Sequence, residues 1–363
     1  MKYKGVSYDV GRVMGGNWRP DYDPKIVHRE LEIIKNDLHC NAVRICGLDI
    51  DRLMISAEDA LKQGLYVWLS PEMWDRNPKE TLAYIAKVAQ AAEKLNQQYP
   101  DRLVLCVGSE LTLFMNGIVE GRNVMERMTK LMVKLRQQQQ KDLVDMIANA
   151  QSAEYNKILN EFLAKANNAV REVFHGKVSY ASLLWEGVDW DLFDFVGVDH
   201  YMSIKIKDKY IETLRPSFEH KKPVVVTEFG FRTYKGADTS TEGMAGDIMD
   251  YKSVFLHHLP VVGLFVRQKL KGTYERDETM QARELVSQLR TLDDAGVEGA
   301  FIMTFIAPTT PFDNDPKYDL DMASYSLVKS YSKGKRGTTY SDMTWEPKEA
   351  FKAVASYYAL KKS

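Results

Sequence analysis

The strongest constraint on the fold is the regular alternation of short apolar runs with amphipathic segments along the whole chain. Eight runs rich in Val, Ile, Leu and aromatic residues have the length and composition of buried strands. They cover residues 5–10, 41–47, 65–72, 102–110, 178–186, 195–201, 223–228 and 299–306. The segments between them carry helix-start signals such as Asp23-Pro24 and Asn77-Pro78. This alternation predicts parallel strands joined by right-handed helical crossovers.

Eight such units predict an α/β fold of the (β/α)8 or TIM barrel type, with residues 1–363 forming a single catalytic barrel. The chain exceeds the roughly 250 residues typical of this fold. We therefore expect a helical insertion after the fourth strand, over about 123–174, and a long loop after the eighth strand, from Pro308. A doubly wound open sheet is the alternative. The first strand, however, is not followed by the Gly-x-Gly-x-x-Gly pattern of dinucleotide-binding sheets.

Composition narrows the range of partners. The formal net charge is −1, which gives no indication of a nucleic-acid partner or an anionic membrane surface. The sequence contains no apolar run of the roughly 18 residues that a membrane span needs, and its start lacks a signal-peptide pattern. We expect a cytoplasmic protein that needs no cofactor and no metal. Its three cysteines are expected to be free and buried.

Polar side chains gather where the predicted strands end, which is the edge that carries the active site in barrels of this type. They are Tyr8, Asp9, Arg44, Glu72, Trp74, Ser109, Glu110, Trp185, Glu186, Asp199, His200, Tyr201 and Glu228. Glu110 and Glu228 stand out because each ends a strongly apolar strand. Burying a lone carboxylate in such a place costs several kcal/mol unless it is paired or neutral.

Two facing carboxyl groups are suited to the cleavage of a glycosidic bond. One donates a proton to the leaving oxygen, and the other attacks the anomeric carbon or activates a water molecule. The proton donor has to stay protonated near neutral pH, which apolar surroundings and the charge of the second carboxylate promote.

These residues resemble motifs of clan A of the glycoside hydrolases, the retaining (β/α)8 enzymes that include β-mannanases and β-galactanases. Gly108-Ser109-Glu110-Leu111 resembles the acid/base motif at the end of strand four. Thr227-Glu228-Phe229-Gly230 closely resembles the nucleophile motif at the end of strand seven. The family also places an arginine on strand two and often a tyrosine after strand six. Arg44 and the pair His200-Tyr201 match these places.

The resemblance implies that Glu110 is the acid/base and Glu228 the nucleophile of a retaining glycoside hydrolase acting on a carbohydrate. Arg44 would keep Glu228 ionised, and Tyr201 would orient it. The sequence departs from the family at two positions: Ser109 replaces an asparagine, and Phe305 stands where a tryptophan is common. We expect further substrate contacts from polar residues at the strand ends and from aromatic rings that could stack on a sugar, namely Asp9, Trp18, Glu72, Trp74, Ser109, Trp185, His200 and Tyr201.

Two other functions remain open. Glu110, Asp199, His200 and Glu228 could bind a divalent metal ion in a barrel of the sugar isomerase type. The barrel could also bind a glycan or a protein without catalysis, although binding alone does not require a buried pair of carboxylates. Neither the sugar, its linkage nor the oligomeric state follows from the sequence.

Overall fold

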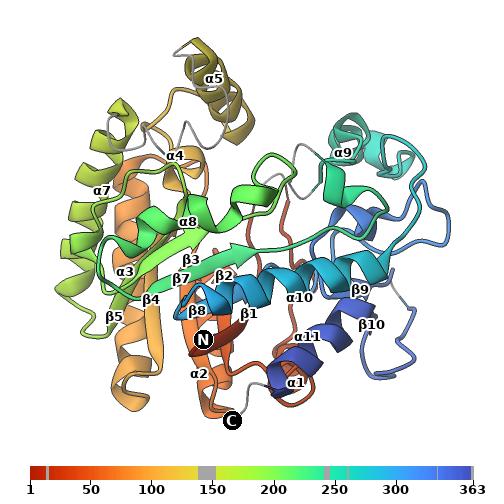
Figure 1. Cartoon of the computed structure of the whole chain (residues 1–363), viewed down its shortest axis with the longest axis horizontal. Coiled ribbons are helices and arrows are strands. Elements are labelled where there is room, and N and C mark those ends of the chain that lie inside the picture. Colours follow the sequence, from red (N-terminus) through yellow and green to blue (C-terminus); the bar gives the residue numbers. More distant parts are fainter. Residues whose placement is uncertain (14–15, 138–152, 241–245, 260, 333, 361–363) are drawn as a thin grey trace.

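Eight parallel strands close into a barrel in which each strand pairs with the next in the chain and β8 pairs with β1 (Figure 1). The computed structural model describes residues 1–363 except 14–15, 138–152, 241–245, 260, 333 and 361–363. The barrel strands are β1 Tyr3–Asp9, β2 Ala42–Gly47, β3 Tyr66–Pro71, β4 Leu103–Ser109, β5 Lys177–Leu183, β6 Val196–Asp199, β7 Val224–Phe229 and β8 Gly299–Ile302. The predicted (β/α)8 barrel is therefore confirmed.

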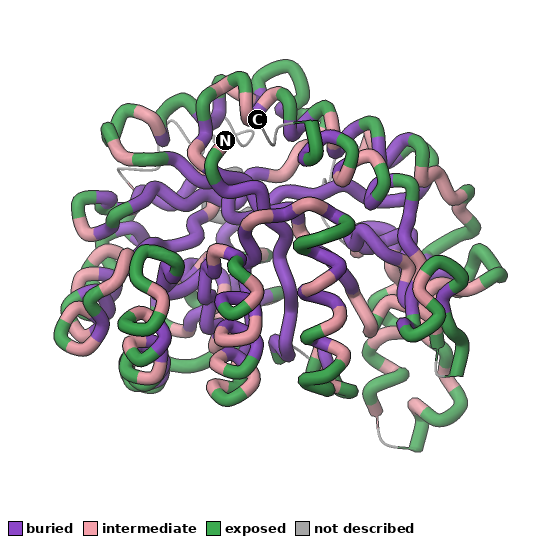
Figure 2. The backbone as a smooth tube through the Cα atoms, turned by 90° about the horizontal axis from the view of Figure 1, so that it is seen from below, coloured by how far each residue is buried: buried purple, intermediate pink, exposed green. Residues whose placement is uncertain are grey.

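The helices are α1 Pro24–Asn36, α2 Ile50–Lys62, α3 Pro78–Gln98, α4 Leu111–Phe114, α5 Val124–Gln137, α7 Glu154–Arg171, α8 Tyr210–Phe218, α9 Tyr251–His257, α10 Glu278–Asp294 and α11 Glu349–Leu360. Most of them lie around the outside of the barrel, whereas α5 and α9 lie away from the strands (Figure 1). The two expected helix starts are capped by the side chains of Asp23 and Asn77, each of which accepts a backbone N–H hydrogen bond. Figure 2 shows buried strands at the centre and helices whose exposed sides face outward. Among the described residues, no helix has the length and apolar character needed to cross a membrane.

Alternate residues of each strand belong to two different cores, as the period of two in a strand requires. On β2 and β3, Val43, Val67 and Leu69 join the large core between strands and helices. Ala42 and Trp68 instead join a smaller core inside the barrel. The Trp68 ring centroid lies 5.0 Å from that of Phe195 and 5.4 Å from that of Phe301, so aromatic rings fill this layer of the interior.

Arg44, Ser70 and Glu72 follow Ala42 and Trp68 at intervals of two along the same inward-facing rows. Along the interior, the lining thus changes from aromatic to charged toward the carboxyl ends of the strands. This change positions the polar side chains considered below.

Three connections differ from a simple crossover. After β4, α4, α5 and α7 form the predicted helical insertion, part of which (138–152) lies outside the described residues. The predicted loop after β8 includes a two-stranded antiparallel sheet of β9 Val328–Ser330 and β10 Trp345–Pro347. A third long connection, between β7 and α10, contains the short helix α9. Three strands end at least two residues earlier than predicted. β5 ends at Leu183, where the backbone turns back through a Glu186 N–H bond to the Leu183 carbonyl, β6 ends at Asp199, and β8 ends at Ile302.

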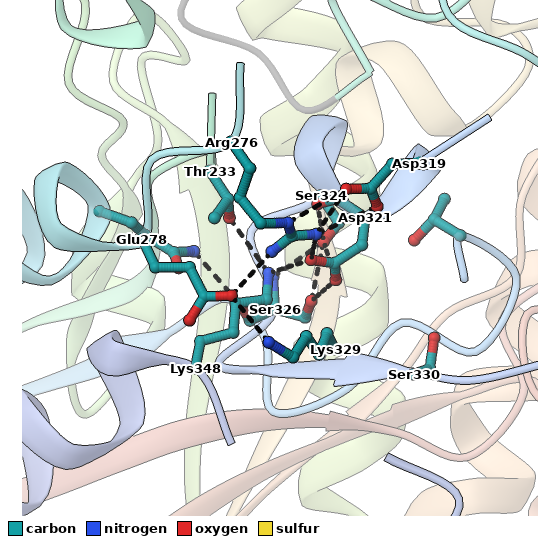
Figure 3. A network of polar contacts seen from close by, with 12 residues as sticks. Thr233, Arg276, Glu278, Asp319, Asp321, Ser324, Ser326, Lys329, Ser330 and Lys348 are labelled. Atoms are coloured by element: carbon teal, nitrogen blue, oxygen red, sulfur yellow. Dashed lines mark hydrogen bonds and ion pairs between the residues drawn. The ribbon is translucent and has the colours of Figure 1, made fainter. Parts of the chain in front are cut away.

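A partly buried set of ion pairs joins the connection after β7, the connection after β8 and the start of α11 (Figure 3). We call it the loop network, and it consists of Arg276, Glu278, Asp319, Asp321, Lys329 and Lys348. Arg276 lies 3.0 Å from Asp319 and 2.7 Å from Asp321, and Lys348 lies 2.8 Å from Asp321. Because the Lys348 side chain is fully buried, its charge depends on this carboxylate for compensation.

Candidate active site

The carboxyl ends of β4, β6 and β7 share an irregularity that decides which side chains face the interior. The pairing register shifts between Cys106 and Ser109, between Val198 and Asp199, and between Val226 and Phe229. Such bulges reorient the side chains that follow them. Strict alternation along β7 would place Glu228 on the helix-facing side with Val226. The shift instead brings Glu228 against Arg44 inside the barrel.

Glu228 lies among groups that favour its ionised form. The Arg44 guanidinium contacts Oε1, and the Tyr201 hydroxyl donates a hydrogen bond of 2.6 Å to Oε2. Arg12 lies 3.8 Å from Oε1. Burial acts to raise the pKa of Glu228, but the charges of Arg44 and Arg12 and the Tyr201 hydrogen bond outweigh it, so the pKa is lowered. A buried carboxylate that stays ionised is chemically available as a nucleophile.

Glu110 directly follows β4, and its backbone has the left-handed values φ 48° and ψ 42°, which are uncommon for a residue with a side chain. Hydrogen bonds from β5 hold this turn. The Leu111 N–H donates to the Tyr180 hydroxyl at 2.7 Å, and that hydroxyl donates to the Glu186 carboxylate at 3.0 Å. Glu186 also accepts the Thr112 N–H at 3.0 Å. Glu110 is thus fixed by a clamp that joins two strands.

The pKa of Glu110 is raised well above its usual range. Burial is the main cause, followed by the negative charges of Asp199, Glu228 and Glu186. Glu110 is nevertheless partly exposed, so it can reach a molecule outside the barrel. A carboxyl group that keeps its proton and faces the opening has the properties of a general acid.

Asp199, at the end of β6, completes a group of three carboxyl groups. One carboxyl oxygen from each of Glu110, Asp199 and Glu228 lies within 4.8 Å of the other two. Asp199 is 3% exposed and accepts hydrogen bonds from Thr227 Oγ1 at 2.6 Å and from Ser109 Oγ at 3.5 Å. Carboxylate oxygens are ligands that divalent cations accept, so these three side chains could also reach one metal ion.

Asp9 and Glu72, both predicted site residues, meet at Arg12. Arg12 Nε lies 2.6 Å from Asp9, and Nη1 lies 3.3 Å from Glu72, which in turn lies 3.3 Å from Arg44 Nη2. We call Asp9, Arg12, Arg44, Glu72, Glu110, Asp199 and Glu228 the rim cluster. Burial is the largest influence on Glu72, and its pKa is raised despite the two arginines.

The tryptophans on the same side form part of an aromatic surface next to Arg12. The ring centroids of Trp18 and Trp74 are 5.3 Å apart, and Trp74 stacks on Phe114 at 4.4 Å. The Arg12 guanidinium carbon lies 4.9 Å from the Trp18 ring. The indole N–H of Trp74 is buried without a hydrogen-bond partner, so one donor is available at this edge.

Two predicted site residues lie elsewhere. The His200 ring stacks on Tyr210 at 4.0 Å, and its Nε2 lies 2.7 Å from the Tyr210 carbonyl oxygen. Burial lowers the pKa of His200 to about 4. Trp185 packs edge-on against Tyr155. Both rings are buried against the helical shell, so the structure does not bring them to the carboxyl groups.

Four residues contribute to the site although no role in the favoured chemistry was predicted for them: Arg12, Tyr180, Glu186 and Asp199. Arg12 lies in a Gly-rich loop and Tyr180 within an apolar run, so neither has a local signal. Glu186 and Asp199 lie among the polar residues at the strand ends, and this position is the sequence signal that could have identified them as site residues.

Comparisons with known proteins concern the fold. No protein-family model matches the sequence, and no curated protein matches it. Among solved structures, a GH113 β-1,4-mannanase aligns with 99% of this chain over 98% of its own length, at a TM-score of 0.58 and 14% identity. The GH113 β-mannanase AaManA from Alicyclobacillus acidocaldarius in complex with ManMIm aligns at a TM-score of 0.55 and 14% identity, covering 99% and 97% of the two chains. PbGH5A, a glycoside hydrolase family 5 enzyme from Prevotella bryantii B14, aligns at 0.50 and 12%, covering 98% and 96%.

Proposed function

We propose that this chain is a retaining glycoside hydrolase in which Glu228 is the nucleophile and Glu110 the acid/base. The observation that carries the proposal is the pair itself. One carboxyl oxygen of Glu110 lies within 4.8 Å of one carboxyl oxygen of Glu228, and the surroundings shift the two pKa values in opposite directions. A separation of about 5 Å between carboxyl groups is typical of retaining enzymes, whereas inverting enzymes need about 6.5–9.5 Å to admit a water molecule.

In the first step, a Glu228 oxygen forms a bond to the anomeric carbon as the glycosidic C–O bond breaks, and Glu110 gives its proton to the departing oxygen. In the second step, Glu110, now a carboxylate, takes a proton from water. The water oxygen bonds to the anomeric carbon and releases Glu228. Arg44 and Tyr201 hold Glu228 ionised and oriented before the attack. These two steps use no cofactor.

The substrate class is a β-linked glycan or oligosaccharide, and β-mannosides are the first candidates because two of the aligned structures are mannanases. Trp18 and Trp74 offer aromatic surface for a sugar ring next to the rim cluster. Ser109 in place of asparagine leaves a shorter donor beside the pair, already directed at Asp199.

The test compares two alanine variants on a panel of 2,4-dinitrophenyl β-glycosides, whose leaving group needs no proton. Glu228→Ala should lower kcat more than about 10⁴-fold, and added azide should restore turnover with a glycosyl azide of inverted configuration. Glu110→Ala should spare the first step on these substrates, and azide should then give a product of retained configuration. Glu120→Ala, which removes an exposed glutamate on the connection after β4, is the matched control.

Absence of wild-type turnover across the panel would refute the proposed function. Equal behaviour of both alanine variants on activated and unactivated substrates would refute the assignment of roles.

The three-carboxylate group favours one second candidate, a metal-dependent sugar isomerase. Glu110, Asp199 and Glu228 could bind one divalent ion, although Arg44 already occupies one Glu228 oxygen. Stoichiometric Mn²⁺ or Mg²⁺ in the purified protein, with activity lost to a chelator, would select this candidate over hydrolysis.

A further inference from the structure

The connection between β7 and α10 contains a segment that lies away from the strands of the barrel (Figure 1). We call residues 250–269 the α9 arm, because they contain α9 and a short 3₁₀ turn, Val262–Leu264. The arm is closed at its base, where Met249 and Leu270 form an isolated antiparallel bridge. The chain therefore leaves the body of the protein and returns to it at one place.

The α9 arm contributes nothing to the core of the barrel. Of the seven residues of α9, only Ser253 is buried, and none of the three residues of the 3₁₀ turn is buried. No described residue between 251 and 266 belongs to either hydrophobic core or packs against one. A helix this short is not stable in water by itself, because most helical stability comes from the packing of an apolar face. The barrel does not provide that packing for α9.

The apolar side chains of the α9 arm are exposed instead. Five of them have exposed fractions between 41% and 84%, and we call them the arm patch: Phe255, Val261, Val262, Leu264 and Phe265. They form one surface because the 3₁₀ turn lies directly against the end of α9. The Gly263 N–H donates to the Leu259 carbonyl at 2.9 Å, and a Cβ on Gly263 would lie only 2.0 Å from the His257 carbonyl oxygen.

The arm patch is large enough to form a protein interface. Five side chains of these sizes and exposures present on the order of 600 Å² of apolar surface, which is at the upper end of what monomeric proteins expose in one patch. The partly exposed Leu256, Leu259 and Val266 add to this area. A standard interface buries about 800 Å² on each partner. The available area is therefore close to what a stable complex requires.

The backbone at Val261 gives a second, independent indication of a partner. Its values of φ 67° and ψ −54° are those of a strained γ-turn, and a positive φ is a genuine outlier for a β-branched residue. Such strain persists only where the surroundings determine the conformation. The Val261 side chain, however, is 70% exposed. Contacts from outside this chain would provide the missing support.

The charges of the α9 arm favour an apolar partner over an anionic membrane. Asp250 lies 3.7 Å from Lys269, and Arg267 lies 2.6 Å from Asp313. Among the described residues of the arm, Lys252 is the one lysine or arginine without an ion pair. Attraction to anionic lipid relies on clusters of about 4–8 such cations. A single positive charge is too little for that attraction, and it causes little repulsion between two copies of the arm.

We propose that the arm patch is the surface through which two copies of this chain form a symmetric dimer. In a two-fold interface the same patch is used on both subunits, so an apolar and nearly uncharged surface is complementary to itself. A second arm would cover Phe255, Leu264 and Phe265, complete the packing of α9 and support the backbone at Val261. The inference does not rest on the proposed function, because the oligomeric state is measured without substrate.

Sedimentation velocity of the full chain, from about 1 to about 100 µM, tests the proposal, because an interface of this size predicts a Kd in the micromolar range or tighter. The wild type should have twice the mass of the chain at the upper concentrations. Leu264→Glu places two charges in the interface and should raise the Kd at least about 100-fold. Phe265→Ser should act in the same direction. Leu360→Glu is the matched control, since Leu360, on α11, is 81% exposed and Leu264 is 82% exposed.

Circular dichroism should show the same spectrum for all variants, because the substituted side chains are exposed and leave the core intact. A wild type that stays monomeric up to about 100 µM would overturn the proposal. A dimer that both arm variants leave intact would also overturn it. Vesicles of phosphatidylserine and phosphatidylcholine test the lipid alternative, and a monomer that binds them through Leu264 would assign the arm patch to a membrane instead of a second copy.

Discussion

The loop network and the rim cluster both contain buried charged side chains, but they differ in the balance of positive and negative charge. The loop network contains three cations (Arg276, Lys329 and Lys348) and three carboxylates (Glu278, Asp319 and Asp321). The rim cluster contains two cations (Arg12 and Arg44) but five carboxyl groups (Asp9, Glu72, Glu110, Asp199 and Glu228).

The pKa values follow this difference in part. In the loop network, burial acts to raise the pKa of Asp321, but Lys348 and Arg276 prevail and lower it, whereas burial raises the pKa of Asp319 to about 6. In the rim cluster, burial and neighbouring carboxyl groups raise the pKa values of Glu72, Glu110 and Asp199, whereas Arg44 and Arg12 outweigh burial at Glu228 and lower its pKa. Excess negative charge therefore adds to the effect of burial at the carboxyl groups that have no arginine in direct contact.

The largest change in the free energy of unfolding is expected when the charge balance of the loop network is removed. Asp321→Ala leaves the buried Lys348 and the partly buried Arg276 without their shared carboxylate, and we expect it to lower the free energy of unfolding by about 3–5 kcal/mol in urea titration. Asp342→Ala, which removes the exposed partner of Arg29, should cost at most about 1 kcal/mol. Similar small losses for both variants would show that the loop network does not depend on its charge balance.

The next largest expected effect is on the pH dependence of the free energy of unfolding, and it involves Glu186, which holds the turn at Glu110. Burial raises the pKa of Glu186 from its ordinary value of 4.5 to about 7. A raised pKa in the folded state contributes stability that is complete below pH 4.5 and is lost as the pH rises through 7. The free energy of unfolding of the wild type should therefore fall relative to Glu186→Gln across this window, by up to about 1.4 kcal/mol per pH unit. Parallel curves for the two proteins in urea titrations from pH 4 to 8 would contradict this assignment.

The smallest expected effect is an increase in stability, at the rim cluster. Glu110→Gln removes one carboxyl group from a cluster that has more carboxyl groups than cations. We therefore expect the free energy of unfolding at pH 8 to rise by about 1 kcal/mol, while activity on unactivated glycosides is lost. Glu120→Gln, at an exposed position, should leave both quantities unchanged. Destabilisation by Glu110→Gln would instead show that Glu110 stabilises the fold, as the charged residues of the loop network are expected to do.

The fold followed from the sequence because the signal was repeated eight times, so an error at one strand would not have changed the architecture. Glu110 and Glu228 could be paired in advance because parallel barrel strands deliver their ends to one edge. The contacts of Arg44 and Tyr201 with Glu228 also agree with the expectation from the motifs.

The finer arrangement could not be predicted, because it depends on bulges and on turns. Asp199, His200 and Tyr201 are consecutive polar residues, yet Asp199 joins the carboxyl groups, His200 turns toward Tyr210 on α8, and Tyr201 returns to Glu228. Trp185 likewise lies in the turn after β5 and packs against α7. The alternation of side chains between the two faces of a strand does not predict where side chains point beyond the last paired residue.

The left-handed backbone at Glu110 has a consequence for how this protein can diverge. A glutamate costs about 1 kcal/mol or more in that conformation, whereas glycine adopts it freely and asparagine tolerates it. The local folding preference therefore works against the acid at this position. Under the proposed function, a descendant lineage released from selection for turnover should exchange Glu110 for glycine or asparagine early, and such a replacement among relatives would mark the barrels that no longer use this acid.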